Sequence, residues 1–148
     1  MNPARRASAV IAIDHGTKKT GFAVADALRI TTEPLEPFRG PGDSKGLLDH
    51  VAGLLAERDV STLLVGLPRL ASGDEGPRAA DVRAFAAKLA ARFPGVEVVL
   101  YDEHLTTKAA EDLLREAGHR GPAARARRDS WSALVLLRDW LDSNESGS

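Results

Sequence analysis

The chain has 148 residues, of which 43% are hydrophobic and 28% are charged, and its formal net charge is −1 at pH 7. These values are typical of a soluble globular domain with a single core, and they exclude a disordered chain, a collagen-like repeat and a coiled coil. The absence of cysteine excludes disulfides, thiolate metal sites and thiol nucleophiles, and it is compatible with a reducing compartment.

The N-terminal residues show no pattern of a targeting segment. The apolar stretch Ala7–Ile13 is followed by Asp14 and is too short for the core of a signal peptide or for a membrane span. We therefore expect a cytoplasmic protein with no membrane partner. A single domain over residues 1–142 fits the length of the chain, and we expect the tail over 143–148 to be disordered.

In the first half of the chain, short apolar and β-branched runs predict strands, with one helix before the last of them. The strands are expected at Ser8–Ile13, Gly21–Asp26, Ile30–Leu35 and Thr62–Val65. Prolines 34 and 37 limit the third strand to an edge of the sheet, because proline lacks the N–H that a central strand needs. Leucine and valine recur at helical spacing over residues 47–55 and predict the helix.

The second half predicts one more strand and three helices. A helix begins at Pro77 and ends before Pro94, a strand covers Val96–Tyr101, and two helices follow at about Thr107–Ala117 and Ala126–Leu141. Strands and helices therefore alternate after an initial meander. This order predicts an α/β fold with a mixed five-stranded sheet, in which a three-strand meander precedes parallel strands and helices cover both faces.

Three acids stand where such a fold is expected to carry its chemistry. Asp14 closes the first strand, Glu103 closes the last strand, and Asp129 lies in the predicted first turn of the last helix. Ligands bind beyond the carboxyl ends of parallel strands, so side chains at these ends can meet. Oxygen ligands suit hard cations, and magnesium or manganese ions held there could bind the attacking and leaving oxygens of a displacement at phosphorus.

Each acid also has a purely structural interpretation. Asp14 could shape the turn after the first strand, Glu103 could accept a hydrogen bond from a following threonine, and Asp129 could be a helix-start acid favoured by the helix dipole. Each acid taken alone is therefore compatible with a metal site and with a purely structural role.

Basic and glycine-rich segments near these acids indicate contacts to phosphate. Thr17 and Lys18 lie in the loop after the first strand, Arg78 ends a long polar loop, and Arg127 and Arg128 close an arginine-rich stretch. Backbone N–H groups and cations in such segments can hold phosphates, with an affinity that falls as salt rises. The same residues could equally form ordinary turns and a solvated surface.

The four histidines do not form a zinc pattern, because no close pair shares one helix face. His50 and His119 are expected at the surface. His104 could contact the substrate or pack against the protein.

Four blocks of the sequence together resemble the YqgF/RuvX family. They are DHGTKKTGFAVAD over residues 14–26, VGLP over 65–68 with Gly73 and EGPR over 75–78, DEHLTT over 102–107, and Asp129 before an alanine- and leucine-rich helix. Their order over nearly the whole chain is far more specific than any one motif. His15 and His104 depart from the family, which often has an aromatic or aliphatic residue at the first position and commonly arginine at the second. A histidine holds phosphate fully only when it is protonated.

The resemblance implies a ribonuclease H-like fold related to the RuvC resolvase, with Asp14, Glu103 and Asp129 as the catalytic acids that bind Mg²⁺ or Mn²⁺. It implies a nuclease that processes the 5′ end of pre-16S rRNA in ribosome biogenesis, or alternatively a Holliday junction resolvase that acts on branched DNA. A monomer and a homodimer are both compatible with it, and a ribosomal precursor particle is a candidate partner. The residues expected to contact the structured RNA or branched DNA are Thr17, Lys18, Arg78, His104, Arg127 and Arg128.

Two other classes of function remain open. The Asp-x-Gly-Thr motif after a first strand is similar to the phosphate loop of actin-like and sugar-kinase ATPases, but those proteins need two such domains and this chain has room for one. A chain that keeps the fold without catalysis would instead be an RNA- or ribosome-binding module. The three intact acids favour the nuclease.

Overall fold

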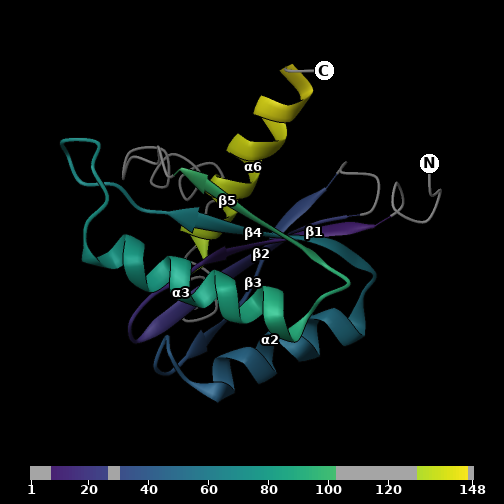
Figure 1. The fold of residues 1–148 in the computed structure, drawn as a ribbon. Helices are drawn as coiled ribbons and strands as arrows, with labels where there is room; N and C mark the ends of the chain where they lie inside the picture. The colour runs from purple at the N-terminus through teal and green to yellow at the C-terminus, as the bar shows by residue number, and fades with distance from the viewer. Residues whose placement is uncertain (1–7, 27–30, 103–129, 147–148) are drawn as a thin grey trace, which may run out of the picture.

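The computed structural model describes residues 8–26, 31–102 and 130–146, and these residues form one five-stranded sheet (Figure 1). The strands are β1 (Ala9–Asp14), β2 (Lys19–Ala25), β3 (Thr32–Arg39), β4 (Val60–Leu67) and β5 (Glu97–Asp102). Their order across the sheet is β3-β2-β1-β4-β5. The first three pair antiparallel as a meander, whereas β1, β4 and β5 are parallel to one another. The predicted mixed sheet is therefore confirmed.

Helices cover both faces of this sheet, as predicted. The helices α2 (Lys45–Glu57) and α3 (Pro77–Arg92) lie on one face, and α6 (Trp131–Ser146) lies on the other (Figure 1). Successive strand residues point to opposite faces, so Ile11 and Ile13 of β1 join the core under α2 and α3, while Val10 and Ala12 join the core under α6. No helix in the described ranges is both long and apolar enough to cross a membrane.

Local signals set the ends of the two helices on the first face. The Ser44 hydroxyl caps α2 by accepting a hydrogen bond from the Leu47 N–H at 3.2 Å. Pro77 begins α3, where its missing N–H is not needed, and the helix ends where the Phe93 N–H donates to the Leu89 carbonyl before Pro94. The predicted start of α3 is confirmed.

The edge strand β3 is longer than predicted. It runs through Pro34 and Pro37 to Arg39 and pairs only with β2, so neither proline has to donate to a second strand. The placement of this strand at an edge is confirmed, and its predicted end at Leu35 is wrong.

The last helix differs from the prediction at both ends. It begins at Trp131, not near Ala126, because the Ser130 carbonyl accepts the first helical hydrogen bond, from the Leu134 N–H at 3.1 Å. Asp129, which was predicted in its first turn, lies outside the described residues. The helix continues past Leu141 to Ser146, and the predicted helix over 107–117 lies outside the described residues.

The Tyr101 hydroxyl supports the last turns of α6. It donates to Asp139 Oδ2 at 2.8 Å and lies 3.0 Å from the Ser143 hydroxyl, so β5 holds the helix beyond its predicted end. Burial and the Asp139 carboxylate raise the pKa of Tyr101 against the opposing effect of the Ser143 hydrogen bond. The phenol therefore remains a donor at neutral pH.

His50 is not the surface residue that was predicted. Its ring packs between Phe22 and Phe38, with centroid distances of 5.0 and 5.6 Å. The Nε2 atom is buried and has no hydrogen-bond partner among the described residues, and burial lowers the pKa of His50 below its ordinary value. His50 is thus a half-buried residue whose ring packs against two phenylalanines. His119 lies outside the described residues.

Candidate active site at the sheet edge

Asp14 lies at the edge of the sheet where three parallel strands end. These strands close at Asp14, Leu67 and Asp102, and their parallel pairing brings the three carboxyl ends together. The Asp14 side chain is half-buried and follows Val10 and Ala12 on the α6 face of β1. The predicted position of Asp14 at the end of the first strand is confirmed.

Glycines flank Asp14 on both neighbouring strands. Asp14 pairs with Gly21 of β2, and Gly66 of β4 stands beside it because the preceding residues, Ile13 and Val65, are partners. Both glycines occur at strand positions that face α6, and neither carries a side chain there. Neither strand neighbour of Asp14 therefore places a side chain beside its carboxylate on the α6 face.

Ser130 ties the start of α6 to the same edge. The β2–β3 register shifts between Thr20 and Phe22, and at this irregularity the Phe22 N–H donates to Ser130 Oγ at 3.1 Å. Both residues are fully buried, and Phe22 is the β2 partner of Ile13, the residue before Asp14. The start of α6 is thus held beside the end of β1.

Five of the predicted site residues lie outside the described residues: Glu103, His104, Arg127, Arg128 and Asp129. Their assignments stay predictions. Within the described ranges, no three His, Cys, Asp or Glu side chains form a group that could hold a metal ion. The described part of the chain therefore contributes one predicted metal ligand, Asp14.

The loop after β1 is held by backbone hydrogen bonds to the segment after β3. The carbonyls of Lys18 and Thr17 accept from the N–H groups of Gly40 and Gly42 at 2.9 and 3.1 Å. The side chains of Thr17 and Lys18 are exposed. A side chain at Gly42 would collide with the Gly16 carbonyl and the His15 ring, so this close approach requires glycine.

His15 is a structural residue beneath this loop. Its ring is buried, stacks on Phe85 at a centroid distance of 4.5 Å, and places Nε2 2.8 Å from the Gly42 carbonyl. Arg78 Nη2 donates to the His15 carbonyl at 2.7 Å and lies 3.2 Å from Nδ1. Burial lowers the pKa of His15, which matches a neutral ring that donates from Nε2 and accepts at Nδ1.

Arg78 is anchored to the protein and is not a free cation. In addition to its bonds with His15, its Nη1 donates to Asp81 Oδ2 at 3.0 Å, yet 39% of its side chain stays exposed. Arg78 and Thr17 line one cavity, while Lys18 is not among the lining residues. The structure thus brings together two of the three described residues that were predicted to contact nucleic acid.

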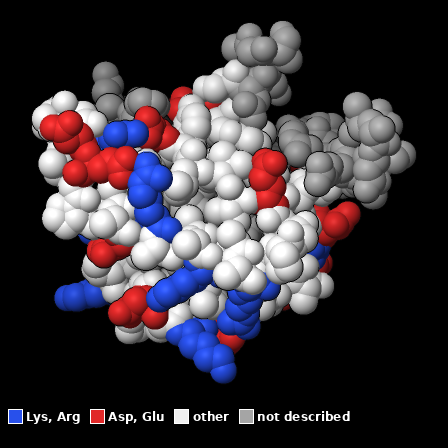
Figure 2. Space-filling view, viewed as in Figure 1, with Lys and Arg blue, Asp and Glu red and all other residues white. Residues whose placement is uncertain are grey.

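Cations and anions are mixed on the face that α2 and α3 cover. Figure 2 shows lysine and arginine side chains mainly over its lower part, with acidic groups among them and a further acidic cluster near the loop that follows β4. This face carries no continuous basic field, so contacts to a nucleic acid here depend on a few placed cations.

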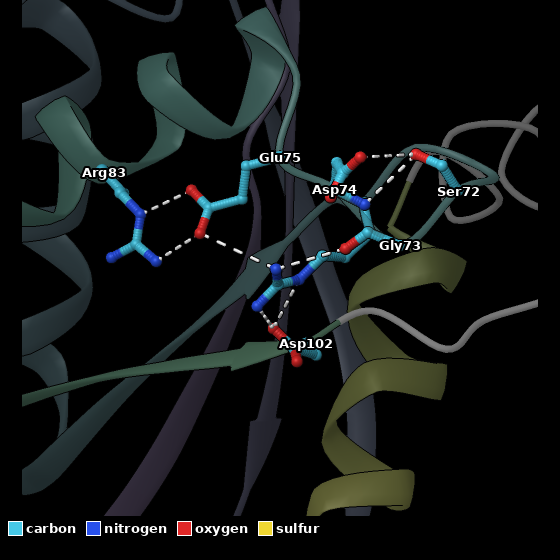
Figure 3. A network of polar contacts seen from close by, with 7 residues as sticks. Ser72, Gly73, Asp74, Glu75, Arg83 and Asp102 are labelled. Atoms are coloured by element: carbon cyan, nitrogen blue, oxygen red, sulfur yellow. Dashed lines mark hydrogen bonds and ion pairs between the residues drawn. The ribbon is translucent and has the colours of Figure 1, made fainter.

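A network of ion pairs that the sequence analysis missed closes the loop after β4 onto the end of β5 (Figure 3). Arg69 donates to Asp102 Oδ1 from Nε at 3.2 Å and from Nη2 at 3.0 Å, and its Nη1 lies 3.8 Å from Glu75 Oε2. Arg83 of α3 donates to both Glu75 oxygens at 2.7 Å. These Arg83 hydrogen bonds are the main reason that the pKa of Glu75 is lowered.

The network braces the residue that precedes Glu103 in the sequence. Asp102 of β5 is joined through Arg69 and Glu75, both in the loop after β4, to Arg83 on α3, so the network links three segments of the chain. Glu75 was noted only as part of a motif, and no periodicity or spacing indicated that Arg69 and Arg83 would be its partners. Only the three-dimensional structure identifies Arg69 and Arg83 as the partners of Glu75.

Comparison with known proteins identifies a family and a fold. A family model described as RuvX, Holliday junction resolvase, matches residues 8–143. A protein of Nocardioides sp. named "Putative pre-16S rRNA nuclease" is 40% identical over 146 residues, which cover 95% of this chain and 92% of the relative. A protein of Anaeromyxobacter sp. with the same name is 40% identical over 136 residues, which cover 92% of this chain and 98% of the relative.

Among solved structures, the RuvC protein of Thermus thermophilus superposes with a TM-score of 0.56. Its sequence is 14% identical, and the match covers 92% of this chain and 96% of that one. At this identity the similarity concerns the fold alone. The predicted ribonuclease H-like fold is thereby confirmed.

Proposed function

This chain belongs to the RuvX family of Holliday junction resolvases, and from that premise we propose that it is a nuclease that hydrolyses phosphodiester bonds in the 5′-end processing of pre-16S rRNA. The choice of rRNA over a junction rests on the names of relatives that this chain matches over more than nine-tenths of its length. Such a protein would act in the cytoplasm on RNA or on a ribosomal precursor particle.

The observation that carries the proposal is that Asp14 lies at the same edge of the sheet as Asp102 and Ser130, which are the sequence neighbours of Glu103 and Asp129. Glu103 follows directly after Asp102, which ends β5 at the edge where Asp14 ends β1. Asp129 directly precedes Ser130, which is bonded to β2 beside that edge. Segments that are distant in the sequence thus support a common site for the three carboxylates.

The described part of this site fits a hard divalent cation. Asp14 offers carboxylate oxygens, and its neighbours Gly21 and Gly66 add no side chain on the face where α6 begins. We propose that Asp14, Glu103 and Asp129 hold Mg²⁺ or Mn²⁺. A bound cation of this kind would supply activation of water and charge stabilisation at the scissile phosphate. The carboxylate oxygens would themselves be the ligands that hold the cation in place.

The remaining predicted residues would position the substrate backbone. Thr17 and Lys18 are exposed in the loop next to Asp14, and Arg78 presents part of its guanidinium beside Thr17. His104, Arg127 and Arg128 stay candidates for further phosphate contacts. Because such contacts release counterions, substrate affinity should fall as the salt concentration rises.

The test is cleavage by the Asp14→Asn protein. This substitution keeps the size of the side chain but removes its charge, so we expect cleavage of a pre-16S rRNA fragment with Mg²⁺ or Mn²⁺ to disappear while the unfolding temperature is kept. Asp49→Asn, on the exposed surface of α2, is the matched control and should cleave normally. Persistent cleavage by purified Asp14→Asn protein would refute the assignment.

Resolution of Holliday junctions is the second candidate, favoured by the description of the matched family. The same assay includes a four-way DNA junction beside the RNA. A resolvase must cut two symmetric strands, so junction cleavage should come with a homodimer, whereas RNA processing does not require one. Preferential junction cleavage by a dimer would replace rRNA as the proposed substrate.

A further inference from the structure

A cavity of about 240 Å³ lies on the side of the sheet that carries α3, opposite to the face of the Asp14 side chain, and its lining includes His15, the residue that follows Asp14. One wall is a single face of this helix, because Arg78, Asp81, Phe85 and Lys88 follow one another at intervals of three or four residues. Thr17 and Asp43, from the loops after β1 and β3, lie on the opposite wall. The cavity is therefore a groove between a rigid helix and two loops that are bonded to each other.

The groove leads away from the proposed site of cleavage. One end is Arg78, whose guanidinium is bonded to the carbonyl of the residue after Asp14. The other end is Lys88, ten residues along α3, which corresponds to about 15 Å at a rise of 1.5 Å per residue. Stacked nucleotides advance by about 3.4 Å along one strand, so this length matches about four of them.

The charges in the groove suit a nucleic-acid strand that is held by a few contacts. Lys88 is exposed and forms no ion pair or hydrogen bond with any residue in the described ranges, so its ammonium is available for a phosphate. Asp81 compensates part of the charge of Arg78, and Asp43 is exposed. Carboxylates can accept hydrogen bonds from base amino groups and from 2′-hydroxyls, which a single strand presents.

The size of the cavity favours a single strand. Pockets for drug-sized molecules are usually about 300–1,000 Å³, so this smaller cavity holds only part of a strand and has no room for a duplex. The other nucleotides of a flank of about four would lie along the exposed face of α3 beside it. The sparse cations of this face, visible in Figure 2, also lack the continuous basic surface that duplex binding uses.

We propose that this groove binds a single-stranded flank of the nucleic-acid substrate, with Lys88 contacting a backbone phosphate at the end distant from Asp14. The proposal rests on the proposed function only in that the substrate is a nucleic acid. It names Lys88 as a determinant of affinity for the flank and not as a catalytic residue.

The test measures binding and not cleavage. RNA hairpins with single-stranded flanks of increasing length are titrated with the full-length protein by fluorescence anisotropy, in EDTA so that no cleavage occurs. The variants are Lys88→Gln, Lys88→Arg, and Lys45→Gln, an exposed lysine on α2, as the matched control. Affinity of the unchanged protein should rise as the flank lengthens from none to about four nucleotides, the length of the groove.

Loss of one single-strand phosphate contact reduces the magnitude of the slope of log K against log salt by about 0.7. If the variant and the unchanged protein bind equally at 1 M salt, the variant then binds about fourfold more weakly at 0.15 M salt. We expect this loss for Lys88→Gln with flanked hairpins alone, recovery with Lys88→Arg, and no loss for Lys45→Gln. If Lys88→Gln and the unchanged protein show the same affinity and the same slope, the proposal that the groove binds a flank is wrong. It is also wrong if Lys45→Gln loses as much affinity as Lys88→Gln.

The outcome is separable from that of the proposed function. If Asp14→Asn still cleaves but Lys88→Gln loses flank binding, the active-site assignment fails and the groove stands. If Asp14→Asn is inactive but Lys88→Gln binds every hairpin normally, the nuclease stands and the groove fails. A DNA flank with the same dependence on Lys88 also supports the groove, through phosphate contacts that both nucleic acids share.

Discussion

Replacing Ser130 with alanine should destabilise the protein through a single hydrogen bond. Ser130 Oγ accepts from the Phe22 N–H at 3.1 Å, and both residues are fully buried. The β2–β3 register shifts at this N–H, and because the site is fully buried, bulk water cannot replace the lost partner. Ser130→Ala removes only an oxygen atom and leaves this donor unpaired in the core.

An unpaired buried donor costs about 1–3 kcal/mol, so we expect the free energy of unfolding to fall by that amount. For a chain of this size, each kcal/mol lowers the melting temperature by about 2–4 °C. Urea titration followed by circular dichroism measures the free energy, and calorimetry measures the temperature. Because Ser130 follows Asp129 directly, nuclease activity at a temperature where the variant stays folded should also fall.

Ser72→Ala provides the matched control. The Ser72 hydroxyl donates to Asp74 Oδ2 at 3.2 Å in an exposed loop, where water can replace it, so the change should stay within about 0.5 kcal/mol. If Ser130→Ala and Ser72→Ala lose the same small free energy, then Ser130 does not satisfy a buried donor, and our account of how α6 is joined to β2 is wrong.

Two further variants test the half-buried His50 and the ion-pair network. Burial lowers the pKa of His50 from its ordinary value of 6.5, so below pH 6.5 the unfolded chain takes up a proton before the folded one does. Stability should therefore fall as the pH falls from 6.5 to the lowered pKa, and His50→Phe should flatten this part of a stability–pH curve; an unchanged curve contradicts the assignment. Arg69→Gln should change the free energy of unfolding by less than about 1 kcal/mol, since its ion pairs are partly exposed, but should lower kcat by releasing Asp102. Arg92→Gln, which breaks the similarly exposed pair with Asp49, is the control, and equal kcat values for the two variants would contradict a positioning role for Arg69.

The order of strands and helices could be predicted because each element carries its own periodicity. The positions of Asp14 and Arg78 followed from strand and helix ends that proline, glycine and apolar runs mark locally. The predicted start of α6 was wrong. The Ser130 carbonyl accepts a helical hydrogen bond from the Leu134 N–H, and the Ser130 hydroxyl is held by the backbone of β2, more than a hundred residues earlier in the chain. No local pattern near residue 130 records that contact.

The burial of His15 and His50 could not be predicted for a similar reason. The sequence around a histidine does not show whether its ring is exposed. The aromatic neighbours of these two rings are set by the packing of α3 and α2 against the sheet. The pairing of Arg69 with Asp102 and of Glu75 with Arg83 joins segments whose charges show no helical or strand spacing. Ion pairs between loops depend on how those loops are brought together.

The sequence by itself determined the class of fold and the family, because strand periodicity, turn residues and four ordered motifs are local properties of the chain. The tertiary structure decided which residues meet: glycines beside Asp14, Ser130 on β2, the Arg69–Asp102 contact, and the groove from Arg78 to Lys88. These depend on the register of parallel strands and on the packing of helices on both faces, which are properties of the whole fold and not of any segment.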